Sequence, residues 1–114
     1  MKTERADKKP RNSYVYIVEL DPLVLQKKKF REENPGYIEG LACYYVGMTG
    51  LTPHERFANH KRGYKASKYV RDFGIRLRPD LYDKYNPLSR IEAEQLEVRI
   101  AKRLRSLGHA VWQR

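Results

Sequence analysis

SYVYIVEL, residues 13–20, is the stretch that decides the fold class. Its even-numbered residues, from Tyr14 to Leu20, fall on one face of an extended chain and alternate with those of the other face. Aromatic and β-branched residues in this alternation are typical of a partly buried strand. We therefore predict a strand over 13–20, ended by the Asp21-Pro22 pair.

Local signals place the other elements around this strand. Two capping boxes, Thr52 with Glu55 and Ser89 with Glu92, mark the starts of helices. Helices are expected over residues 53–62, 67–73 and 89–107, the last ending at Gly108. Strands are expected over residues 42–48, 77–85 and 109–113, with Pro79 interrupting the middle one and residues 23–41 forming a long connection.

These elements predict an α/β fold: a small antiparallel sheet of about three strands flanked by helices. A chain of 114 residues has room for one domain, which we assign to residues 13–114. Residues 1–12 are rich in Lys and Arg and lack apolar periodicity, so they are expected to form a flexible basic arm.

Charge indicates the class of partner. Lys and Arg number 24 against 14 acidic residues, giving a formal net charge of +10. Such a protein attracts polyanions, and nucleic acid is the leading expectation; the alternatives are that the charge serves solubility or favours an anionic membrane. No apolar run resembles a membrane span or a signal sequence, so we expect a cytoplasmic protein that does not enter a membrane.

Cys43 is the single cysteine of the chain. One cysteine excludes an internal disulfide and any zinc site built from several thiolates. Its expected role is that of a small buried apolar residue.

The last predicted helix contains three glutamates with different expected roles. Glu92 completes the capping box and Glu94 is expected to face solvent. Glu97 lies beside the apolar stripe, flanked by Ala93 and Ala101 one turn away on either side. A carboxylate at such a place needs a cation, either an arginine or a divalent metal; position alone favours the commoner salt bridge.

Basic residues gather in and after the first predicted helix. Arg56 and His60 are four residues apart and share one helix face, where they could meet a phosphate or form a plain solvated face. Residues 61–71 interleave cations with tyrosines, a pattern that suits a nucleic-acid backbone. The expected nucleic-acid contacts there are Lys61, Arg62, Lys65, Lys68 and Arg71.

Taken in order, these residues resemble the GIY-YIG nuclease family. Residues 14–16 (YVY) resemble its GIY element, with tyrosine in place of the first glycine, and residues 45–47 (YVG) resemble its YIG element. Arg56 falls at the position of the family's helix arginine, His60 at a common histidine, and the segment 92–97 ends in the glutamate that would bind metal. The connection between the two tyrosine motifs is longer than the family's, and the late asparagine has no clear equivalent near residues 109–113.

The resemblance implies a metal-dependent endonuclease that hydrolyses phosphodiester bonds, with DNA as the expected substrate. Glu97 would hold Mg²⁺ or Mn²⁺, which favours the metal role over the salt bridge. Arg56 and His60 would act at the phosphate, and Tyr16 with Tyr45 would orient or deprotonate water. A separate specificity partner is expected, because the chain is too short to hold a specificity module. The alternative is a nucleic-acid-binding module that keeps the fold without cutting; a structural RNA-binding protein would leave Glu97 unexplained.

Overall fold

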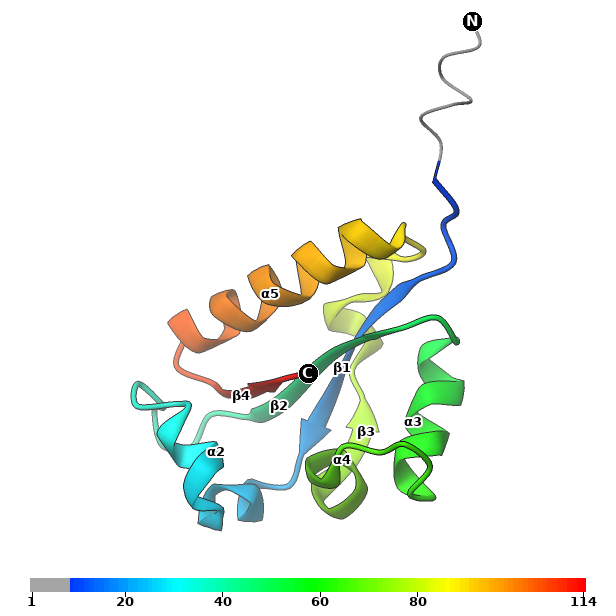
Figure 1. Cartoon of the computed structure of the whole chain (residues 1–114). Coiled ribbons are helices and arrows are strands. Elements are labelled where there is room, and N and C mark those ends of the chain that lie inside the picture. Colours follow the sequence, from blue (N-terminus) through cyan, green and yellow to red (C-terminus); the bar gives the residue numbers. More distant parts are fainter. Residues whose placement is uncertain (1–8) are drawn as a thin grey trace, which may run out of the picture.

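Four strands and the helices around them form the body of the protein (Figure 1). The computed structural model describes residues 9–114. The strands are β1 (Tyr14–Leu20), β2 (Cys43–Thr49), β3 (Gly74–Leu77) and β4 (Ala110–Gln113). The helices are α2 (Lys28–Glu32), α3 (Pro53–Lys61), α4 (Lys68–Phe73) and α5 (Arg90–Ser106). Short 3₁₀ turns are η1 (Pro22–Gln26), η2 (Pro79–Leu81) and η3 (Asp83–Tyr85).

The sheet has the order β3-β1-β2-β4 and is mixed. β1 pairs antiparallel with both β2 and β3, whereas β4 runs parallel to β2. The α/β class is confirmed, but the purely antiparallel sheet of about three strands is not. Alternation predicts that a segment is a strand without fixing the direction in which it pairs, because that depends on the path of the chain between strands.

Helices cover both faces of the sheet (Figure 1). α5 lies on the face of Ile17, which lines one pocket together with Leu96 and Leu104 of that helix. On the other face, Tyr16 meets His60 of α3, and the aromatic cluster around Trp112 joins α2 and α4 to the sheet. The two tyrosines of the sequence motifs lie on this second face, since Tyr16 pairs with Gly47 and Val18 with Tyr45.

The predicted helix caps are confirmed. Thr52 and Ser89 each accept a bond from the third helical residue, whose glutamate bonds back, so both capping boxes are complete. Gly108 follows α5 with a φ of 101°, a left-handed conformation that favours glycine. A Cβ there would also meet Ile38, so this position requires glycine for both reasons.

Two expected features of the helices and the sheet are wrong. The strand expected over 77–85 ends at Leu77, and the residues after it form η2 and η3, because Pro79 cannot donate to a strand ladder. The spacing of apolar residues over 91–107 also predicts that Ile91 lies on the buried stripe of the last helix, but Ile91 is 52% exposed. It lies in the first turn of α5, two residues before Ala93, which is the first buried residue of the helix.

The long connection 23–41 is more ordered than the sequence indicated. η1 and α2 lie within it, and Phe30 of α2 is fully buried against Tyr69 and Trp112. Asn34 donates to the carbonyl oxygens of Phe30 and Val111 and accepts from the Val111 N–H. The connection is therefore tied to β4 and forms part of the core.

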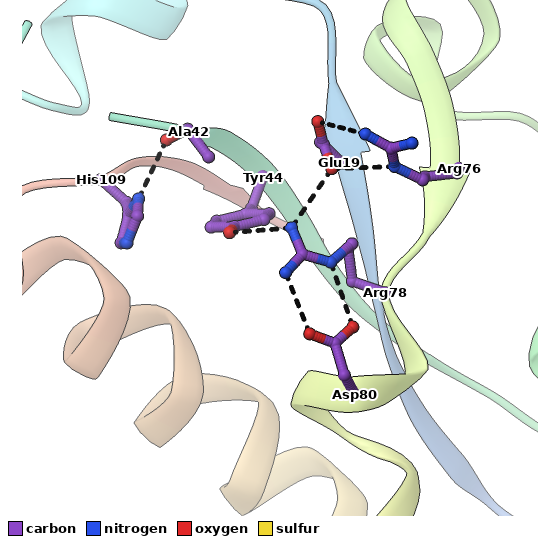
Figure 2. Close-up of polar contacts among 7 residues, drawn as sticks. All are labelled: Glu19, Ala42, Tyr44, Arg76, Arg78, Asp80 and His109. Atoms are coloured by element: carbon purple, nitrogen blue, oxygen red, sulfur yellow. Dashed lines mark hydrogen bonds and ion pairs between the residues drawn. The ribbon is translucent and has the colours of Figure 1, made fainter. Parts of the chain in front are cut away.

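A network of charges ties β1 to β3 and to the turn that follows it (Figure 2). Arg76 donates to both carboxylate oxygens of Glu19, and Arg78 donates to Glu19 at 3.2 Å and to Asp80 at 2.9 Å. The Arg76 bond is the main reason that the pKa of Glu19 is lowered. Every carboxylate here has a cation and each cation a carboxylate, so the network holds the fold and offers no free charge to a ligand.

Other expectations concern burial and membranes. Cys43 is a free, buried cysteine, as expected. Within residues 9–114, no helix is long and apolar enough to cross a membrane. Residues 9–12 of the expected basic arm are exposed, while residues 1–8 lie outside the described part of the chain.

Candidate active site

Three aromatic side chains meet on the face of the sheet under α3. The hydroxyl oxygen of Tyr16 is 2.8 Å from Nε2 of His60, and the ring of Tyr45 lies 6.1 Å from that of Tyr16 and 5.6 Å from that of His60, between centroids. All three side chains are buried, with at most 3% of their surface exposed. The two strands and the helix that the sequence singled out therefore converge on one cluster, which we call the Tyr–His cluster (Tyr16, Tyr45 and His60).

Backbone geometry sets the protonation of His60. Its Nδ1 accepts a hydrogen bond of 3.0 Å from the backbone N–H of Ser67, at the start of α4. A nitrogen that accepts cannot carry a proton, so the ring proton is on Nε2 and is donated to the Tyr16 hydroxyl. Burial, and secondarily the charge of Arg56, lowers the pKa of His60 to about 4. His60 is therefore neutral at neutral pH and acts as a hydrogen-bond donor to Tyr16.

Gly47 makes room for Tyr16. The two residues are partners across β1 and β2, and the Tyr16 ring lies over the glycine. A Cβ on Gly47 would lie 2.8 Å from both Cζ and the hydroxyl oxygen of Tyr16. The glycine of the YVG motif thus has a local steric reason, which is the position of the phenol on the neighbouring strand.

Arg56 lies beside the Tyr–His cluster and is half-buried. Its Nη2 donates to the carbonyl oxygen of Lys65 at 2.8 Å and its Nη1 to that of Tyr64 at 3.4 Å. Its charge lowers the pKa of both Tyr16 and Tyr45, which indicates that the guanidinium is close to both phenols. Arg56 therefore links the loop after α3 to the cluster.

Burial dominates the ionisation of the two tyrosines. It raises the pKa of Tyr16 far above the usual value of a phenol, and the neighbouring Tyr45 raises it further. Burial also raises the pKa of Tyr45, although Tyr16 and Arg56 counteract part of the increase. Both phenols remain protonated at neutral pH, so they can donate hydrogen bonds but are poor bases.

Glu97 is placed differently from the other predicted site residues. α5 covers the opposite face of the sheet from α3, and the carboxylate of Glu97 lies at the end of β4, where it is 3% exposed. It accepts from Nε2 of Gln113 at 3.3 Å and from Nε of Arg114 at 3.2 Å. Burial raises its pKa and Arg114 lowers it.

The salt bridge that helical position favoured for Glu97 is thus present, with Arg114 as the partner. Burial is the main reason that the pKa of Tyr45 is raised; the charge of Glu97 raises it further, and that of its partner Arg114 lowers it. Tyr45 packs on Tyr16 and His60, and the charges of Arg56 and of the Glu97–Arg114 pair both affect its pKa.

Burial limits what the five expected site residues (Tyr16, Tyr45, Arg56, His60 and Glu97) can contact. Tyr16 and His60 have no exposed surface and Tyr45 is 3% exposed, so the half-buried Arg56 is the most accessible of these four residues. A pocket of about 380 Å³ lies at the ends of β1 and β2. Its wall includes Thr49, Arg90 and Arg114, and Arg114 is the residue paired with Glu97.

A metal at this site would have few protein ligands. Among residues 9–114, no group of three or more His, Cys, Asp or Glu side chains is gathered as a metal site. Glu97 offers carboxylate oxygens, and Mg²⁺ is often held by one or two carboxylates with water and phosphate oxygens completing its shell. The donor set fits such a metal only if the carboxylate exchanges Arg114 for it.

The basic residues of the segment 61–71 divide by their contacts. Nζ of Lys61 donates to the carbonyl oxygens of Arg71 and Gly74, both at 3.0 Å, and so closes the end of α4. Arg71 pairs with Asp72, and Arg62 donates to Asn59. Lys65 and Lys68 are exposed and lie near the rings of Tyr64 and Tyr69, so they are the freest to meet a ligand.

Two residues of the site had no signal that sequence reasoning used. Ser67 acts through its backbone N–H, which any non-proline residue would supply, so its side chain gives no indication of the role. Arg114 follows β4, which runs parallel to β2 and ends beside the Glu97 carboxylate. The contact therefore depends on how distant segments pair.

Comparison with protein-family models, with curated proteins and with solved structures found no match to this chain. The resemblance to GIY-YIG nucleases therefore rests on the order of the residues alone, and what it implies about activity is a proposal.

Proposed function

We propose that the protein is a metal-dependent endonuclease that hydrolyses phosphodiester bonds in DNA. The proposal rests on the packing of Tyr45 against Tyr16 and His60, with Arg56 close to them. The charge of Glu97 also affects the pKa of the Tyr45 phenol. The formal charge of +10 supplies the attraction to a polyanion. We place the activity in the cytoplasm, where the Cys43 thiol would remain reduced.

In this proposal, Arg56 and Tyr45 face the scissile phosphate. Arg56 stabilises the negative charge that builds up on the phosphate oxygens. Tyr45 donates a hydrogen bond to the attacking water or to a phosphate oxygen, and it does not remove a proton, because burial keeps the phenol protonated. The water oxygen forms the new bond to phosphorus and loses a proton to the surrounding solvent, while the bond from phosphorus to the 3′ oxygen breaks and that oxygen takes up a proton from solvent to leave as a hydroxyl.

Tyr16 and His60 are positioning residues in this scheme. The chain of contacts runs from the Ser67 N–H to His60, and from His60 to the Tyr16 hydroxyl. It fixes the phenol against which Tyr45 packs. Placing reacting groups accurately lowers the barrier even for residues that never touch the substrate.

Glu97 would hold the divalent metal, Mg²⁺ or Mn²⁺, through its carboxylate. A bound metal would neutralise charge on the phosphate and on the departing 3′ oxygen. Within the chain, the requirement is that Arg114 releases the carboxylate. Arg114 is exposed, and it faces a pocket where a substrate phosphate would offer it another anion.

A second candidate is a nucleic-acid-binding module without catalysis. The observation in its favour is the same ion pair, since a Glu97 carboxylate that remains bound to Arg114 and Gln113 would hold no metal. The basic surface would then be the functional part, and the Tyr–His cluster would be part of the core.

The two candidates are separated by one experiment. Supercoiled plasmid and single-stranded DNA and RNA are incubated with the protein in Mg²⁺, in Mn²⁺ and in EDTA, and binding to the same substrates is measured in parallel. The endonuclease predicts cleavage in metal, none in EDTA, and loss of cleavage in the Arg56→Ala variant. Binding that weakens with salt, without cleavage in either metal, would instead establish the binding module and end the endonuclease proposal.

A further inference from the structure

A second basic site lies outside the candidate active site, where the connection between β1 and β2 meets α4 (Figure 1). It is a pocket of about 230 Å³. Four lysines line it with two aromatic residues and one carboxylate: Lys27, Lys28, Lys29, Lys68, Tyr69, Phe73 and Asp72. We call it the lysine pocket.

Packing in the core brings the two walls of the lysine pocket together. Phe30, the residue after the lysine run, packs edge-on against Tyr69 with 5.5 Å between ring centroids. Both aromatic residues are buried. The lysines before Phe30 and Lys68 before Tyr69 are therefore held on facing segments by a fixed contact, although the two segments are far apart in the sequence.

The charge in the lysine pocket is not balanced by the protein. Asp72 is the one carboxylate in its wall, and Arg71, which lies outside, already pairs with it at 2.9 Å. Lys28 is 4.0 Å from Glu32, which is the limit of an exposed ion pair. Cations that gather without partners repel one another, and an anion in the pocket would relieve that repulsion.

Aromatic rings hold two of the lysines in place. Nζ of Lys27 lies 6.0 Å from the centroid of Phe73, and Nζ of Lys68 lies 5.6 Å from that of Tyr69. Such contacts favour particular positions of the flexible ammonium groups. The lysine pocket is smaller than is usual for a drug-sized molecule, and ammonium groups with an aromatic floor suit a phosphate group and the edge of its sugar.

We propose that the lysine pocket binds a backbone phosphate of the nucleic acid, away from the bond that is cut. The proposal rests on the proposed function for its partner and adds a contact that the long connection supplies. Nucleic acid is favoured because Lys68 belongs to the same basic segment as Lys65, whose carbonyl oxygen binds Arg56. α3 is joined to α4 by Lys61, so a single strand of phosphates could follow both helices.

The test removes one lysine from each wall of the lysine pocket. The double variant Lys29→Ala/Lys68→Ala is compared with Lys84→Ala/Lys102→Ala, which also removes two exposed lysines but from η3 and α5. Both have the same net charge. Affinity for a 20-base-pair duplex is measured by fluorescence anisotropy over a series of salt concentrations, with melting temperatures as a check on folding.

We expect the pocket variant to bind about 10-fold more weakly and to show a salt dependence reduced by about one phosphate contact. The control pair should lose less than about threefold, and Lys29→Arg/Lys68→Arg should bind nearly as the original protein. Equal losses of DNA affinity in the two double alanine variants, or no DNA binding by the original protein, would overturn the proposal that the lysine pocket binds a phosphate.

Cleavage is recorded separately so that the two proposals can fail independently. Cleavage by the pocket variant and by the original protein is compared at saturating DNA, so that a loss of affinity is separated from a loss of cleavage rate. If the original protein binds DNA without cutting it, the endonuclease fails, while the difference in affinity still decides the lysine pocket. If the pocket variant binds DNA as tightly as the original protein, the proposal for the lysine pocket is wrong, whatever the cleavage result.

Discussion

Nε of Arg114 lies 3.2 Å from Oε2 of Glu97, and the carboxylate that it meets is almost completely buried. An ionised carboxylate in that position needs a cation, and the guanidinium is the one supplied within the described residues. The same carboxylate is the proposed metal ligand. Arg114 and a metal would therefore compete for one group, and this competition makes the role of Glu97 measurable.

Glu97→Gln keeps the size of the side chain and its ability to accept from Gln113, but removes the negative charge that a hard cation needs. Cleavage in Mg²⁺ should fall by about 100-fold or more, because several kcal/mol of charge stabilisation are lost. DNA affinity should stay the same or increase, since a negative charge has left a site that faces a polyanion. Cleavage rate and affinity are measured on the same preparation.

The matched control is Glu92→Gln in the same helix. Glu92 completes the capping box with Ser89, and glutamine can keep the bond to the Ser89 N–H, so the substitution should lower the melting temperature only slightly and leave the cleavage rate unchanged. A folded Glu97→Gln protein that cuts at the original rate would remove Glu97 from the metal site.

Arg114→Gln tests the competition from the other side. Without the guanidinium, cleavage should reach half of its maximal rate at a lower Mg²⁺ concentration, by about threefold to tenfold. The free energy of unfolding without metal should decrease by about 1–2 kcal/mol, less than for a fully buried pair because the Arg114 side chain is half-exposed. A higher Mg²⁺ requirement in the variant would show that Arg114 assists the metal site and does not compete with it.

Gly47→Ala should disturb the Tyr–His cluster. The added Cβ would lie 2.8 Å from the Tyr16 phenol, so the ring must move and its bond to His60 must stretch or break. We expect a loss of about 1–3 kcal/mol in the free energy of unfolding, as for other overpacked cores. Gly36→Ala serves as the control in urea denaturation, because a Cβ there has no neighbour within 4 Å. Equal stabilities for the two variants would contradict the close approach of Tyr16 to β2.

The pH dependence of stability should carry the signature of His60. Its pKa is about 4 in the folded protein, below the usual 6.5, so the unfolded chain takes up a proton first as pH falls. The stabilising contribution is complete above pH 6.5 and is lost as pH falls from about 6.5 to about 4, to a total of at most about 3 kcal/mol. In His60→Gln, which cannot titrate, urea denaturation across this range should show a flatter profile. A variant profile as steep as that of the original protein would assign the effect to other groups.

Local chemistry predicted much of the fold. The capping boxes at Thr52 and Ser89 place α3 and α5, and the alternation of residues 13–20 places β1. The direction of β4 and the position of β3 could not be predicted in this way, because both depend on how distant segments pack. The order hidden in the connection 23–41 was missed for the same reason, since Phe30 is held by residues far along the chain.

The candidate site was predictable to the extent that it depends on periodicity. Tyr16 and Tyr45 share a face because each strand alternates, and His60 follows Arg56 by one helical turn. The difference in burial between Arg56 and His60 was not predictable. Two residues four apart share one side of a helix, but the sequence does not indicate which of them packs against the sheet. His60 packs against the sheet and is buried, while Arg56 is only half-buried.

The absence of a side chain at Gly47 also constrains how this chain can have evolved. Positions 16 and 47 are coupled, since the ring of one occupies the volume that a side chain of the other would need. In a descendant, a larger residue at position 47 should be accompanied by a smaller one at position 16, even where the rest of the sheet is unchanged. Residues 16 and 47 are therefore expected to change together in related sequences that keep this site.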